Sequence, residues 1–197
     1  MGSMLCERRE CARHRDSGVV AVETAIISMF LVTLLFGIVD SSLLFKDYIT
    51  VSAAARAGAR MGASQPLVAG TSNFAQLAAD QVTNSVAGLN PANIQAVWVY
   101  RTTGATGLPD SGSFASCNVC VKFTWNAAAT PPSLQPSYTN WAASSQNACA
   151  GDPARDSLGV YVQYKHTSPA GFFFNNQVLS ESTVMWIEPT TAPICKP

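Results

Sequence analysis

The hydrophobic pattern of the chain begins with one long apolar segment. Residues 19–45 contain only two charged side chains, Glu23 and Asp40. A helix needs about 20 mostly apolar residues to cross a bilayer core of about 30 Å, so this segment is long enough to span a membrane. A removable signal peptide has a shorter apolar region, which makes it the weaker interpretation. Helical periodicity continues until Gly62–Pro66, and we therefore predict a transmembrane helix with an outer extension over residues 19–63.

The rest of the chain alternates between shorter patterns. An amphipathic helix is predicted over residues 71–88, with Thr71 or Ser72 as its cap. Strand-like alternation covers residues 94–101, 119–125, 158–166 and 178–188, and residues 126–156 are predicted to form a long loop. These elements indicate an α+β protein: a long N-terminal transmembrane helix followed by a small domain with one helix and an antiparallel sheet of about four strands.

Two apolar features outside the span leave alternatives open. The helix extension has an unusually small face, made by Ala53, Ala54, Ala57, Gly58 and Ala59. Small residues allow close helix packing, either on the protein's own domain or on a neighbouring subunit. Phe172, Phe173 and Phe174 cannot all face one side of a strand, so we expect packing under a loop or contact with another protein.

The charged flank of the apolar segment predicts its orientation. Arg8, Arg9, Arg13 and Arg15 precede the span. Since Lys and Arg near a helix end favour the cytoplasmic side, residues 1–18 are expected to form a cytoplasmic leader without a fold of its own. Residues 64–197 are then expected to form an extracytoplasmic domain.

The charge composition of the whole chain suggests no polyanion partner. The formal net charge is zero and 12% of residues are charged. A nucleic-acid-binding face requires clustered basic residues, so we expect no nucleic-acid partner.

Cysteines divide between the two sides of the predicted span. Cys6 and Cys11 lie in the leader, and four candidates for disulfides lie outside: Cys117, Cys120, Cys149 and Cys195. Four cysteines allow three pairings, and spacing does not choose among them. The close pair Cys117 and Cys120 also fits zinc or redox chemistry. However, a zinc site would need a second close pair, and a redox pair belongs at a helix start rather than before a strand. We therefore predict structural disulfides, with no metal and no cofactor.

Catalytic residues are scarce. His166 is the only histidine after the leader, and it is expected on the surface or at the end of a strand. Asp152, Asp156, Glu181 and Glu188 are scattered acids without a paired arrangement, and no nucleophile or phosphate-loop motif is present. We predict no catalytic residue and no enzymatic activity.

The segment around the two membrane acids resembles a known family. Gly18 and Glu23, with Val19 between them as the first residue after the glycine, are similar to a prepilin-peptidase site. Gly37-Ile38-Val39-Asp40 follows near the helix end, and residues 54–60 read AARAGAR. Together these elements resemble the TadE-like family of minor pilins or pseudopilins of Tad (Flp) pilus systems. Thr24 departs from the aromatic residue that often follows the glutamate in this family.

This resemblance implies a function and a set of partners. The chain would be a pilin-like protein of the bacterial inner membrane, cleaved after Gly18 by a prepilin peptidase. It would then take part in assembling a Tad pilus that supports adhesion and surface colonisation, either from the membrane or within the filament. Its other partners would be membrane lipid, other pilus and pseudopilin subunits and the inner-membrane assembly platform. Glu23 would neutralise the new amino terminus of Val19, and Asp40 would play a matching role near the outer leaflet or mark an interface. The alternative is an uncleaved, membrane-tethered extracytoplasmic binding module.

Overall fold

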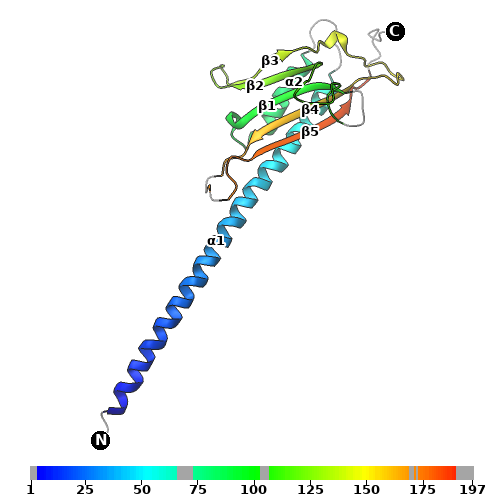
Figure 1. Ribbon diagram of the computed structural model, residues 1–197. Coiled ribbons are helices and arrows are strands. Elements are labelled where there is room, and N and C mark those ends of the chain that lie inside the picture. The colour runs from blue at the N-terminus through cyan, green and yellow to red at the C-terminus, as the bar shows by residue number, and fades with distance from the viewer. Residues whose placement is uncertain (1–3, 66–72, 103–106, 169–170, 172, 190–197) are drawn as a thin grey trace.

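A single long helix carries a small domain at its C-terminal end (Figure 1). The computed structural model describes residues 4–65, 73–102, 107–168, 171 and 173–189, with side chains from Gly18 onward. Helix α1 runs over Met4–Ala63, and 60 residues at 1.5 Å rise give a rod of about 90 Å. The predicted α+β architecture is confirmed.

The helix begins earlier than predicted. Its described part already includes residues 4–17, so the expectation of a leader without a fold is wrong. No proline separates the leader from the apolar run, and a single interior glycine costs a helix only about 1 kcal/mol. Since propagation is easier than nucleation, the helix extends back through the leader.

The second helix and the sheet follow the predicted order with one addition. Helix α2 covers Phe74–Ser85, and Asn73, rather than Thr71 or Ser72, is at its N-cap position. Thr71 and Ser72 lie outside the described residues. The strands are β1 (Ile94–Thr102), β2 (Cys120–Asn126), β3 (Ser133–Thr139), β4 (Ser157–Lys165) and β5 (Val178–Trp186). Short 3₁₀ turns occupy Pro91–Asn93 and Ala143–Ser145.

The sheet has five antiparallel strands rather than about four, in the order β3-β2-β1-β4-β5. The additional strand, β3, lies within the segment predicted to be a loop. Only Leu134 is buried in it, and Pro136 interrupts its pattern. Proline is tolerated here because β3 is an edge strand, where a missing N–H need not break the ladder.

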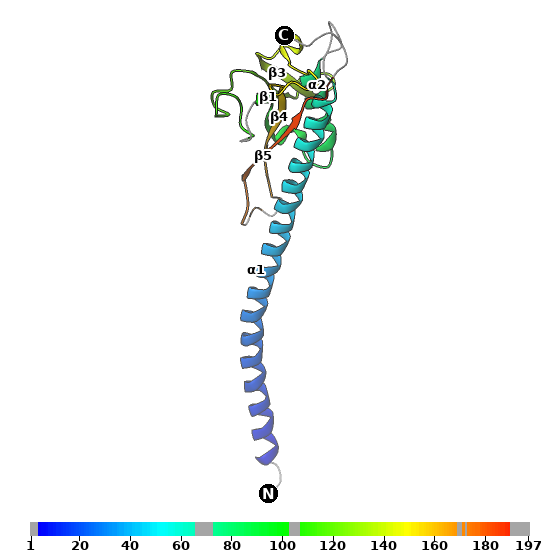
Figure 2. The ribbon, with the colours of Figure 1, turned by 90° about the vertical axis from the view of Figure 1, so that its right-hand side faces the viewer.

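One face of the sheet packs on the two helices. The core combines residues from both helices and from the central strands of the sheet. They are Val51, Ala54, Ala55 and Ala59 of α1; Phe74, Ala78, Ala79 and Val82 of α2; and Val97, Val99, Val160 and Val162 of the central strands. Figure 2 shows the sheet against the upper end of α1, with the N-terminal part of the helix extending away from it. Of the predicted small-residue face of α1, Ala54, Gly58 and Ala59 pack within the protein's own domain, which was one of the two alternatives, whereas Ala57 is half-buried and Ala53 is exposed.

The closest helix approach depends on Gly58. A methyl group at this position would lie 2.6 Å from Val82 Cγ2 and 3.0 Å from the Ala78 carbonyl oxygen. We expect Gly58→Ala to lower the free energy of unfolding by about 1–2 kcal/mol, because this overlap outweighs the gain of about 1 kcal/mol in helix propensity.

Denaturant unfolding in detergent, followed by near-ultraviolet circular dichroism, would measure this change. Gly88→Ala is the matched control, since nothing lies within 4 Å of a methyl group there, and it should change stability by less than about 0.5 kcal/mol. Equal stabilities for the two variants would contradict a tight contact at Gly58.

Candidate functional site

The predicted processing segment lies on the free part of α1. Gly18, Val19 and Glu23 are exposed, and a side chain at Gly18 would meet nothing within 4 Å. Glu23 and Asp40 are 17 residues apart, which corresponds to about 25 Å along the helix. The structure therefore leaves the two predicted membrane acids as separate sites.

Asp40 forms the hydrogen bonds that hold the domain to the apolar part of the helix. Its side chain is fully buried, although the residues on either side of it are exposed or half-buried. The Ser168 hydroxyl donates to Oδ1, and the backbone N–H groups of Phe173 and Phe174 donate to Oδ2 at 3.1 and 3.0 Å. Three donors from the β4–β5 connection thus form hydrogen bonds to one carboxylate. These bonds attach the connection to the helix at Asp40.

A second acid of α1 binds the same connection two turns later. Asp47 Oδ2 lies 2.6 Å from His166 Nδ1, and the His166 side chain is only 1% exposed. Of the two predicted positions for His166, the strand end is confirmed, because it directly follows β4, and the surface is wrong. The histidine is buried because the end of β4 crosses α1, and Asp47 supplies the polar partner that a buried imidazole needs.

This arrangement was missed by the sequence interpretation, but the sequence carries a signal for it. Asp40 and Asp47 are seven residues apart, so they lie on one face of the helix. The same face continues through Val51 and Ala54, which are buried in the core. Two acids on the same helix face as a row of buried residues indicate that a polar segment of the domain covers them.

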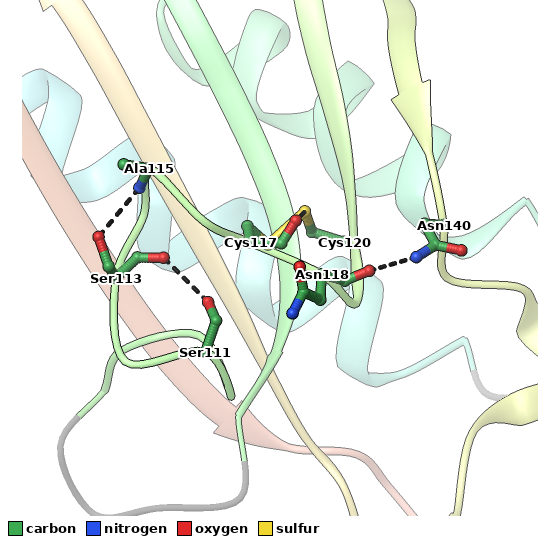
Figure 3. Close-up of a disulfide and its surroundings, with 7 residues drawn as sticks. All are labelled: Ser111, Ser113, Ala115, Cys117, Asn118, Cys120 and Asn140. Atoms are coloured by element: carbon green, nitrogen blue, oxygen red, sulfur yellow. Dashed lines mark hydrogen bonds between the residues drawn. A yellow bond between two sulfur atoms is a disulfide. The ribbon is translucent and has the colours of Figure 1, made fainter.

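Two cysteines are joined at the start of β2, of which Cys120 is the first residue. Cys117 and Cys120 form a disulfide and are both buried (Figure 3). The loop before them is held by Ser113, which accepts a hydrogen bond from Ser111 and takes another from the Ala115 N–H; Asn140 donates to the Asn118 carbonyl. Because the pair leads into a strand, it lacks the helix N-terminus that lowers a thiol pKa in redox motifs. Cys149 is also disulfide-bonded, and Cys195 lies outside the described residues.

Burial shifts the pKa values of two groups at this end of the sheet. Desolvation raises the pKa of Tyr100 to about 12, so its hydroxyl remains a donor to the Gly107 carbonyl at neutral pH. Burial also raises the pKa of Asp156, against the opposing effects of the Asn147 N–H at 2.8 Å and the Arg101 charge. Asp156 is therefore a buried acid directly before β4, and the fold brings it near two acids that are distant from it or unpaired with it in the sequence pattern: Asp152 shares Asn147 with it, and Asp110 shares Arg101.

The described side chains give no evidence of a metal-binding site. No group of three or more His, Cys, Asp or Glu residues within the described ranges could hold a metal ion.

The fold and these contacts define a class of protein: an α+β protein whose described residues include one helix that is a candidate membrane span. Within Gly18–Ala63 of α1, the most apolar part is long enough to cross a membrane and is not buried by the domain. The model of the family described as TadE-like protein matches residues 18–60, so the predicted resemblance is confirmed over this segment. Comparisons with curated proteins and with solved structures gave no match.

Proposed function

We propose that this chain is a minor pilin or pseudopilin of a Tad (Flp) pilus, a structural subunit rather than an enzyme. The family match carries the proposal, because it starts at Gly18 and includes Glu23 and Asp40. The exposed, contact-free position of Gly18 supports cleavage there, since a peptidase must approach the backbone from several sides. Residues 1–18 would be a cytoplasmic leader, and the domain would lie outside the inner membrane.

In this proposal, the partners are a prepilin peptidase, the assembly platform and other pilus subunits. After cleavage, the amino group of Val19 would lie close to Glu23. An amino group and a carboxylate in a low-dielectric layer attract each other strongly and can set the register between neighbouring chains. Exposure of Glu23 in the single chain supports a partner supplied from outside the domain.

The intact mass and N-terminal sequence of the protein from native membranes would test the proposal directly. A chain beginning at Val19 is expected. A chain that retains its leader would overturn the processing step and favour the uncleaved, tethered binding module instead.

Loss of the Glu23 carboxylate is expected to impair assembly but not insertion. Glu23→Ala should enter the membrane at the wild-type level, while sheared pili decrease at least about tenfold, because the new amino terminus loses its counter-charge. Thr24→Ala is the neighbouring control and should assemble normally. Membrane fractionation and quantification of sheared pili would measure both effects, and normal piliation of Glu23→Ala would refute the pairing role.

A further inference from the structure

An apolar groove lies between α1 and the β4–β5 connection. Its volume is about 680 Å³, and its apolar walls are Phe30, Leu34, Ile38 and Phe45 of the helix and Phe173 and Phe174 of the connection. No charged side chain lines it. Phe173 remains 51% exposed although its backbone is bound to Asp40.

The hydroxyl groups in this groove leave its surface apolar. Thr33, Ser41 and Ser42 also line it. Each donates its hydrogen to a carbonyl one turn earlier in α1, at 2.9, 2.8 and 2.8 Å respectively. With these donors used inside the helix, the groove suits a hydrocarbon ligand better than a polar one.

The groove also lies at the correct height to meet the bilayer. If Val19 lies at the cytoplasmic boundary, Asp40 lies about 32 Å further along the helix, which matches the thickness of the hydrocarbon core. From Phe30 to Asp40 the helix rises about 15 Å, or one leaflet. The groove therefore runs along the outer half of the span, and the Asp40 contacts hold Phe173 at its outer boundary.

We propose that the groove binds an acyl chain of an outer-leaflet phospholipid and that the β4–β5 connection rests in the membrane surface. This rests on the membrane anchoring in the proposed function, but not on cleavage or pilus assembly. The lipid is favoured because the helix wall of the groove is continuous with the exposed apolar surface that any bilayer around α1 must cover. Phe173 then acts as an interfacial aromatic, with its side chain in hydrocarbon and its N–H on Asp40.

Quenching by lipids with brominated acyl chains tests this position. Full-length Phe173→Trp would be placed in phosphatidylcholine–phosphatidylglycerol vesicles with and without brominated phosphatidylcholine, and the wild-type emission of the four native tryptophans subtracted. The added emission should be blue-shifted and decrease roughly twofold with the brominated lipid. Tyr138→Trp, an exposed aromatic position on edge strand β3, is the matched control and should not be quenched.

Two further variants distinguish a failure of the groove inference from a failure of the membrane anchoring. Leu31→Trp, at an exposed position of α1 that does not line the groove, reports the span itself. If it is quenched while Phe173→Trp is not, the groove inference is overturned and the anchoring stands; if neither is quenched, both are overturned. Gly37→Leu fills the groove, since a methyl group there already lies 3.9 Å from the Phe173 ring. Combined with Phe173→Trp, it should reduce the quenching, and unchanged quenching would show that the lipid lies outside the groove.

Discussion

Gly18→Phe is expected to remain in the membrane at full length, with mature product reduced at least about tenfold. A peptidase must bind the backbone on both sides of the scissile bond, and glycine permits the closest approach because it has no side chain. Gly18 also lies inside a continuous helix, which must open locally before cleavage. Glycine makes this opening easier by about 1 kcal/mol relative to alanine, and a bulky aromatic residue removes both advantages.

The measurement is the mass of the protein in membranes of cells that express the peptidase. Val32→Phe adds an aromatic ring on the same exposed helix, 14 residues after Gly18 and nine after Glu23, and should mature normally. A mature-sized product from Gly18→Phe would contradict the cleavage assignment. Loss of processing in both variants would show a general effect of bulk on the helix rather than a role of Gly18.

Asp47→Ala is expected to lower the free energy of unfolding of the domain by about 2–4 kcal/mol. The imidazole of His166 is buried, and Asp47 is the partner of its Nδ1 at 2.6 Å. Its Nε2 already has no hydrogen-bond partner among the described residues. Without Asp47 both ring nitrogens would be buried and unpaired, and removing one member of a buried pair costs more than replacing both.

Denaturant unfolding of the full chain in detergent would measure this loss. Lys46→Ala changes the adjacent exposed residue and should change stability by less than about 0.5 kcal/mol. Replacing both partners, as Asp47→Ala with His166→Phe, should recover part of the stability. If the two single changes add without coupling, the hydrogen bond does not stabilise the domain.

The local sequence pattern was sufficient to predict a strand wherever residues alternated regularly between two faces. The four strands predicted from alternation all occur, with ends displaced by at most two residues, because the sequence of each alternates between the two faces of the sheet. Strand β3 was missed because an edge strand with one buried residue and a proline lacks that repeat. The helix start was placed at Val19 because the composition changes there, although helix propagation requires no such change.

The sequence by itself determined the apolar span, the order of the α and β elements and the similarity of residues 18–60 to TadE-like proteins, since these depend on residues close together along the chain. Tertiary structure decided which partners the buried polar groups have. Asp40 and Ser168 are 128 residues apart, and Asp47 and His166 are 119 apart. Such pairs form only when β4 and the connection after it pack along α1. Burial then makes an unpaired carboxylate or imidazole costly, and the fold brings each acid to its donor.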